Sequence, residues 1–209
     1  MISIIMQNRL LGYNQFVTIY LCRHGQNTGD LENRYGGGYD DHLTKDGKEQ
    51  AKVLGQKLSG KGIEKIFTSP KIRAQETAAI LRDILQVEVD VLENFRERDH
   101  YGIMTGMVRT EAKEKYPQLV ELLKDTRNTI EGGEDYQSFG TRIKEAFNEV
   151  VNSGNSTVAV ITHGGPIRYL FREILKQGEI DLTEGPIVKL NYQAGQLNLR
   201  ETEGITLLG

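Results

Sequence analysis

A short run of β-branched residues that ends in Arg, His and Gly is the feature that most limits what this chain can fold into. Residues 17–21 indicate a buried strand, and residues 22–27 then turn polar. Ligands of open α/β sheets bind at the carboxyl ends of strands, so Arg23 and His24 would lie at a candidate binding edge. Arg suits phosphate, His can be a nucleophile, base or metal ligand, and Gly25 permits close approach to the backbone. Taken alone, the tripeptide is equally compatible with a surface loop.

Helices and strands alternate along the rest of the chain. This order predicts an α/β three-layer sandwich, with a mostly parallel central sheet and helices on both faces. Predicted helices cover 45–59, a segment starting at 69–70, 110–124 with a break at Pro117, 134–151 and 164–175. Predicted strands cover 64–68, 87–92, 157–162, 187–192 and 196–200, the last two as a hairpin. Thr44 and Ser69 are the expected N-caps, with Pro70 at the first helical position.

Length and charge restrict the class of protein. The 209 residues fit a single domain over 17–209, preceded by an N-terminal extension over 1–16. The net charge of −3, with acids and bases interspersed, argues against a nucleic-acid partner. No apolar run is long enough for a membrane span, which argues against a membrane partner. The single cysteine, Cys22, suits a reducing compartment, so we expect a cytoplasmic location.

Three later loops repeat the pattern of polar, chemically capable residues after a strand. Arg73 follows Thr68-Ser69-Pro70, His163 precedes two glycines, and residues 93–102 offer several acids. A helix start with free N–H groups suits an anion, and acids could transfer protons. Each loop also has a plainer interpretation, as a surface Arg, a buried structural His or a solvated acidic loop.

In combination, these motifs resemble the histidine phosphatase superfamily, with its phosphoglycerate mutase-like fold, and its small phosphatase branch in particular. The matching segments are Arg23-His24-Gly25, Thr68-Ser69 through Arg73-Ala74, Glu97 with Tyr101-Gly102, and His163-Gly164-Gly165 through Arg168. The resemblance runs from about residue 17 to residue 200, in the family's order. It implies a phosphoric monoester hydrolase that acts on a small phosphorylated metabolite.

The resemblance also implies roles for individual residues. His24 would attack phosphorus and form a phosphohistidine, Arg23, Arg73 and His163 would neutralise the phosphoryl charge, and Glu97 would exchange the proton. Substrate-binding roles fall on Arg23, Gln26, Asn27, Asp30, Gly36, Arg73 and Gly164. No metal and no cofactor are expected, because HExxH and paired cysteines are absent from the sequence.

Several points stay open at this stage. Asn27 and Asp30 depart from the family pattern, and Asp30 puts an acid where an amide often helps to hold phosphate. Residues 93–102 carry an extra residue that could promote Asp99 to the proton donor. A cofactor-dependent phosphoglycerate mutase is the alternative, but the His163-Gly164-Gly165 motif and the one basic residue in 104–109, Arg109, favour hydrolysis. A non-catalytic phospho-ligand binding module is a remote third reading. The expected partner is a small phosphate ester, and the sequence leaves a homodimer open.

Overall fold

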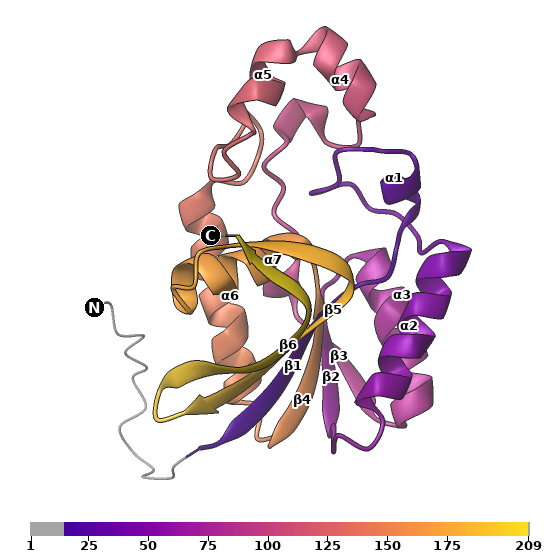
Figure 1. Ribbon diagram of the computed structural model, residues 1–209, viewed down its shortest axis with the longest axis vertical. Coiled ribbons are helices and arrows are strands. Elements are labelled where there is room, and N and C mark those ends of the chain that lie inside the picture. Colours follow the sequence, from indigo (N-terminus) through magenta and orange to yellow (C-terminus); the bar gives the residue numbers. More distant parts are fainter. Residues whose placement is uncertain (1–14, 209) are drawn as a thin grey trace.

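The computed structural model describes residues 15–208, which form one six-stranded sheet with helices on both faces (Figure 1). The strands lie in the order β3-β2-β4-β1-β5-β6. In chain order the first elements are β1 (Val17–Arg23), α1 (Thr28–Leu31), α2 (Lys45–Leu58), β2 (Lys65–Thr68), α3 (Ile72–Leu85), β3 (Glu88–Val91) and the 3-10 helix Glu93–Phe95. There follow the 3-10 helix Gly102–Met104, α4 (Arg109–Lys115), α5 (Pro117–Leu122), α6 (Tyr136–Val151), β4 (Thr157–Thr162), α7 (Gly164–Tyr169), the π-helix Leu170–Ile174, β5 (Glu179–Gln193) and β6 (Gln196–Leu208).

Strands β1 to β4 run parallel to one another, whereas β5 pairs antiparallel with β1 and β6 pairs antiparallel with β5. The carboxyl ends of β1, β2 and β4 therefore meet at one edge of the sheet. The mostly parallel three-layer sandwich expected from the sequence is confirmed.

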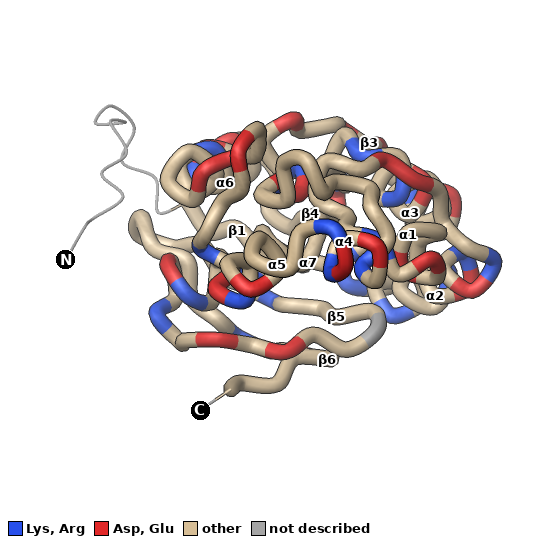
Figure 2. Tube along the Cα trace, turned by 90° about the horizontal axis from the view of Figure 1, so that it is seen from above, with Lys and Arg blue, Asp and Glu red and all other residues tan. Residues whose placement is uncertain are grey.

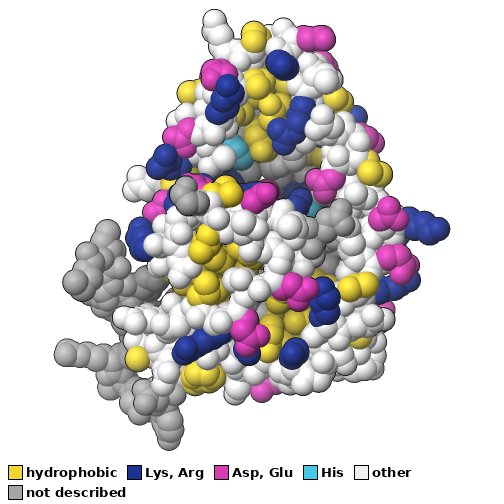
Figure 3. Space-filling model, viewed as in Figure 1, with side chains coloured by type: hydrophobic (Ala, Val, Ile, Leu, Met, Phe, Trp, Pro, Cys, Tyr) yellow, Lys and Arg dark blue, Asp and Glu magenta, His cyan; other side chains and the backbone are white. Residues whose placement is uncertain are grey.

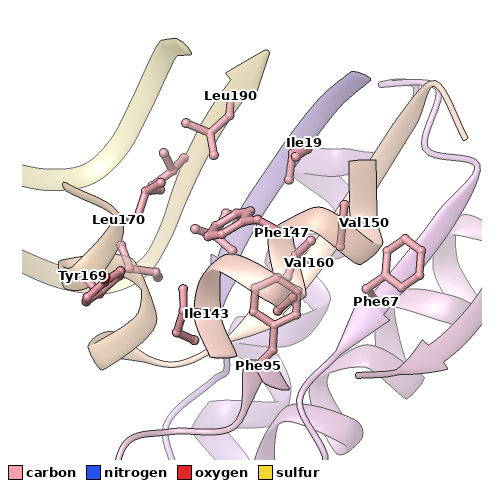
Figure 4. Packing of buried hydrophobic residues seen from close by; sticks show 14 of the residues in the cluster. Ile19, Phe67, Phe95, Ile143, Phe147, Val150, Val160, Tyr169, Leu170 and Leu190 are labelled. Carbon is pink, nitrogen blue, oxygen red and sulfur yellow. The ribbon is translucent and has the colours of Figure 1, made fainter. Parts of the chain in front are cut away.

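Alternation along the strands divides the core into two parts. Ile19, Leu21 and Val160 face α6 and α7, where they pack with Phe147 and Leu170 (Figure 4). The intervening residues Tyr20, Cys22, Ala159 and Ile161 face α2 and α3 and pack with helix residues such as Leu54 and Leu81. A two-residue period places successive side chains on opposite faces, so both layers of helices are anchored by the same strands.

A third, smaller core lies above the carboxyl edge of the sheet. We call residues 98–130 the cap; this segment carries α4 and α5 at the top of Figure 1. Its buried residues Met104, Ala112, Leu123 and Ile130 pack together with Tyr35. The backbone of residues 33–35 joins the cap through Tyr35 N–H, which donates to the Met107 carbonyl at 2.9 Å.

Three boundaries differ from the sequence prediction. Helix α3 begins at Ile72 after Lys71, so Ser69 is not its N-cap and Pro70 is not its first residue. Strands β5 and β6 extend well beyond the predicted hairpin, because residues 179–182 pair with 205–208 across a register shift that absorbs Gly185 and Pro186. The four-residue α1, capped by Asn27, was not predicted.

The interruption at Pro117 is present between α4 and α5, with Pro117 at the first position of α5. Most of the predicted extension over 1–16 lies outside the described residues. Within 15–208 no helix combines the length and apolar character needed to cross a membrane.

Candidate active site

A cavity of about 430 Å³ opens between the carboxyl edge of the sheet and the cap. Figure 3 shows a hollow between the upper and lower parts of the molecule, with charged side chains at its margin. Seven arginines line the cavity, against three acidic residues, Asp30, Asp41 and Glu97. In the view from above, basic and acidic positions alternate along α4, beside the cavity (Figure 2). A chain of net charge −3 has thus concentrated positive charge in one concave site, which suits an anionic ligand.

His24 follows the last residue of β1 and is 6% exposed. Its Nδ1 lies 2.7 Å from the Gly25 carbonyl, an acceptor, so Nδ1 carries the proton and Nε2 keeps its lone pair. Arg73 Nε donates to that Nε2 at 3.2 Å. Burial, together with Arg23 and Arg73, holds the His24 pKa well below its usual value. The site therefore presents a neutral imidazole with one unprotonated nitrogen held in a fixed position.

The backbone of the turn that follows His24 is packed too closely for side chains. A Cβ at Gly25 would lie 2.3 Å from the Gly47 carbonyl oxygen, and one at Gly47 would lie 2.0 Å from the Gln26 carbonyl oxygen. The two glycines thus let the turn after β1 rest directly on the first turn of α2.

Arg73 comes from the first turn of α3 and is almost fully buried. Its Nη1 donates to Asp41 Oδ1 at 3.0 Å and to the Tyr39 carbonyl at 2.8 Å. Asp41 in turn accepts from Gly29 N–H at 2.8 Å, and burial raises its pKa. Sequence reasoning missed Asp41. A buried Arg requires an acid, but nothing in the sequence told Asp41 from its exposed neighbour Asp40.

His163 follows β4 and is completely buried beside His24, with ring centroids 4.9 Å apart. Its Nε2 shares a 2.6 Å hydrogen bond with Ser69 Oγ, whereas Nδ1 has no partner in the described part of the chain. Burial, Arg73 and His24 hold its pKa well below the usual value. When Ser69 donates to Nε2, Nδ1 bears the proton and can donate to a phosphate oxygen.

Glu97 lies on the opposite side, in the loop that leads into the cap. Its Oε2 accepts from Gly165 N–H at 3.1 Å and its Oε1 from Arg98 N–H at 2.8 Å. A Cβ at Gly165 would lie 2.1 Å from Oε1, so the carboxylate rests on a glycine. Asp99 instead accepts from Thr105 Oγ1 at 2.5 Å and packs on Gly38, away from the cavity wall. Of these two acids, only Glu97 lines the cavity.

The predicted substrate-binding residues divide into two groups. Those that line the cavity are Arg23, Asn27, Asp30, Gly36, Arg73 and Gly164. Gln26 does not line it: the Gln26 Oε1 accepts from Thr44 Oγ1 at 2.8 Å, beside the start of α2. Asn27 and Asp30 bond each other's backbone N–H groups as the capping box of α1. The structure thus gives Gln26 a structural role that its position in the motif did not reveal.

The structure adds cavity residues from the cap and from the π-helix Leu170–Ile174 that sequence reasoning did not select. Arg98 is 3% exposed and donates to the carbonyls of residues 126–128, to the Glu134 carbonyl and to Thr129 Oγ1. Arg109 lies over the Tyr35 ring, 4.3 Å from its centroid. Arg172 joins Tyr136 OH, at 2.9 Å, to the carboxylate of Glu179. These contacts connect segments far apart in the sequence, so no local motif announces them.

Comparison with known proteins gives a consistent result. The sequence model of the histidine phosphatase superfamily (branch 1) matches residues 19–202. Phosphoserine phosphatase 1 of Hydrogenobacter thermophilus is 33% identical over 162 residues, 76% of each chain. A 2,3-bisphosphoglycerate-dependent phosphoglycerate mutase of Parvibaculum lavamentivorans is 30% identical over 191 residues, 85% of this chain and 86% of the mutase. Among solved structures, Bacillus stearothermophilus YhfR has a TM-score of 0.80 at 25% identity, and covers 88% of this chain and 95% of its own. The chain belongs to the histidine phosphatase superfamily.

Proposed function

We propose that this protein is a phosphomonoesterase that works through a phosphohistidine at His24. The observation that carries the proposal is the state of His24: a neutral ring whose Nδ1–H is held by the Gly25 carbonyl and whose Nε2 faces Arg73 and His163. An unprotonated imidazole nitrogen amid donors suited to phosphoryl oxygens meets the needs of in-line phosphoryl transfer.

In the first step, His24 Nε2 forms a bond to phosphorus while the phosphorus–oxygen ester bond breaks. Glu97 gives its proton to the departing oxygen. In the second step, Glu97 takes a proton from water, the water oxygen attacks phosphorus, and the phosphorus–nitrogen bond breaks to release inorganic phosphate. One carboxyl group thus serves both steps, as general acid and then as general base.

Arg23, Arg73 and His163 would stabilise the equatorial phosphoryl oxygens, whose charge is the main electrostatic demand of the reaction. No group of three or more metal-ligand side chains is assembled anywhere in residues 15–208. We propose a metal-independent reaction, and activity that survives exhaustive chelation is the expected result. A strict requirement for an added divalent ion would contradict it.

Hydrolysis is favoured over mutase activity by the bonds that Arg98 and Arg34 already make with the protein backbone. A mutase must hold a second substrate hydroxyl and its carboxylate at the phosphoenzyme. Arg98 is consumed by backbone carbonyls of residues 126–134, and Arg34 donates to the Gly106 carbonyl at 2.7 Å. The phosphoglycerate mutase alternative is supported by Arg109, which stacks on Tyr35 at the cavity wall, and by the mutases among the relatives.

The decisive experiment traps the intermediate. Wild-type protein is mixed with a radiolabelled phosphate ester, quenched in base and tested for an acid-labile label. We expect a label on the wild type, none on His24→Ala, and turnover of the variant reduced by at least about 10³-fold, since nucleophile losses are of this size or larger. Folding of His24→Ala is checked by circular dichroism. A folded, fully active variant would overturn the mechanism, and a wild type that binds esters without labelling or turnover would indicate a binding module. Addition of 2,3-bisphosphoglycerate and phosphoglycerate tests the mutase alternative.

A further inference from the structure

Most charged side chains at the cavity wall are already used by the protein itself. Arg73 pairs with Asp41, Arg98 holds the loop at 126–129, and Arg172 takes both oxygens of Glu179. Glu97 accepts two backbone N–H groups. A group that is bound in this way keeps the pocket in shape but has little capacity left for the part of a substrate beyond the phosphate.

Asp30 is the one exposed acid among the three that line the cavity. Its side chain is 41% exposed and reaches the cavity from α1, next to Arg23. One oxygen accepts from Asn27 N–H at 3.3 Å, and the other forms an ion pair with Arg23, whose Nη2 lies 3.7 Å away, beyond the distance of a direct hydrogen bond. An anionic group beside a phosphate site weakens phosphate binding by repulsion. That cost disappears when the substrate brings a cation to Asp30.

Arg168 is an arginine of the cavity wall that the protein holds only weakly. It lies in the last turn of α7 and makes no hydrogen bond or ion pair with the described side chains, although its charge acts on Glu179, which Arg172 already binds. Its Nη1 is 2.7 Å from the position that a Cβ on Gly164 would take, so the guanidinium lies over the start of α7, next to His163. A guanidinium with five free donors suits a carboxylate.

These two groups stand on neighbouring parts of the site. Asp30 follows β1 and Arg168 follows β4, and β1 and β4 are paired along their whole length. Both residues line the cavity beside groups proposed to bind phosphate, Asp30 next to Arg23 and Arg168 next to Gly164. Their charges complement a small leaving group that bears both an ammonium and a carboxylate.

We propose that the substrate is a free O-phosphorylated amino acid, whose ammonium binds Asp30 and whose carboxylate binds Arg168. The proposal rests on the phosphatase function proposed above. A phosphorylated residue inside a peptide lacks both charges, because its amino and carboxyl groups are in amide bonds, and it would be a poor substrate. Binding of the ammonium group accounts for an acid at position 30, where it is unfavourable for the binding of phosphate alone.

Three esters separate the two contacts. Phosphoserine carries both charges, 3-phosphoglycerate replaces the ammonium by a hydroxyl, and phosphoethanolamine lacks the carboxylate. We expect wild-type kcat/KM for phosphoserine to exceed that for either of the others by about 10- to 100-fold, the range of one charge-assisted hydrogen bond. Nitrophenyl phosphate, which has neither charge in its leaving group, gives the reference rate for each variant.

Two variants test the two proposed contacts separately. Asp30→Asn keeps an oxygen for Asn27 N–H but loses the charge, and should lower the phosphoserine to 3-phosphoglycerate ratio by about 10-fold or more. Arg168→Gln should lower the phosphoserine to phosphoethanolamine ratio by a similar factor, and Arg168→Lys should recover part of it. A structural role for either residue would lower all rates together and leave these ratios unchanged.

The outcomes distinguish a failure of this inference from a failure of the proposed phosphatase function on which it rests. Ratios that do not respond to Asp30→Asn and Arg168→Gln overturn the inference, as does a wild type that prefers 3-phosphoglycerate or a phosphoserine peptide. Failure of the wild type to hydrolyse nitrophenyl phosphate overturns the phosphatase function itself.

Discussion

The floor of the cavity and its cap use arginine in opposite ways. At the floor, formed by the carboxyl ends of β1, β2 and β4, Arg73 is aligned by Asp41 and still reaches His24. In the cap, Arg98 directs its donors into the backbone of residues 126–134. The floor is thus organised for a reacting group, whereas the cap is organised to keep a loop in place. A regular sheet holds the side chains at its edge in place, whereas an irregular loop needs side-chain hydrogen bonds to keep its conformation.

The strongest test concerns Glu97, which begins the loop into the cap but is held by Gly165 on the floor. Glu97→Gln should slow esters with poor leaving groups by about 10²- to 10⁴-fold, because the departing oxygen then lacks its proton donor. Nitrophenyl phosphate, whose leaving group scarcely needs a proton, should lose much less. Steady-state rates on both ester types measure the difference.

Asp99→Asn is the matched control, since Asp99 bonds Thr105 away from the cavity wall. Equal losses on both esters for Glu97→Gln would remove Glu97 from the acid role. A loss dependent on the leaving group in Asp99→Asn would move that role to Asp99.

The next test asks whether the alignment of Arg73 matters as well as its charge. Asp41→Asn leaves Arg73 in place but removes the buried carboxylate that orients it, so kcat/KM should fall by about 10- to 100-fold. Asp40→Asn is the control, because Asp40 is exposed and accepts from Ile72 N–H at 2.8 Å, which an Asn oxygen can also do. If kcat/KM in Asp41→Asn matches the wild type, the floor does not depend on this pair.

Removal of the Arg98 side chain from the cap should affect the stability of the protein more than its turnover rate. Arg98→Met leaves the carbonyls of residues 126–128 without their donor and should lower the free energy of unfolding by about 2 kcal/mol. Turnover of nitrophenyl phosphate at saturation should stay within about threefold of wild type, because the floor is intact. Arg96→Met, which loses only partly exposed ion pairs, is the control for denaturant melts. A large fall in kcat with unchanged stability would show that the cap takes part in the chemistry.

The smallest expected effect is a pH dependence of stability that is caused by the two histidines at the floor of the cavity. His24 and His163 have pKa values held below the unfolded value of about 6.5, so the unfolded chain binds more protons as the pH falls. Stability should therefore decrease below about pH 6.5, by about 1 kcal/mol per histidine at pH 5.5. Thermal melts from pH 7.5 to 5.5 measure this slope, and His163→Gln should reduce it. A slope that His163→Gln leaves unchanged would place the titration elsewhere.

Much of the floor was readable from the sequence because each of its groups follows a strand directly. A strand followed directly by a polar turn places His24 at the end of β1 and His163 at the end of β4. Parallel pairing of the two strands brings both turns to one edge of the sheet. The position of Asp41 was not readable, since a loop between two elements can present either of two adjacent acids. The same holds for Gln26, which the motif placed at the phosphate and the structure places against Thr44.

The errors in the fold have similar physical causes. Ser69 and Pro70 have the composition of a helix start, but Ser69 is engaged with His163 and the chain turns two residues later. Residues 179–186 contain acids, Gly185 and Pro186, a composition typical of a loop. They are in a strand because β6 offers a partner across an irregular register, and this long-range pairing is not encoded locally.

The contact between Gly25 and Gly47 has a consequence for engineering. Each position excludes a side chain because the other segment's backbone occupies the space, so the Arg-His-Gly turn and the first turn of α2 form one rigid joint. Transplanting the turn that carries His24 to a different scaffold would require both glycines and the helix that carries the second. A library that varies position 47 to stabilise α2, where glycine is a poor helix former, would in effect be selecting against the geometry of His24.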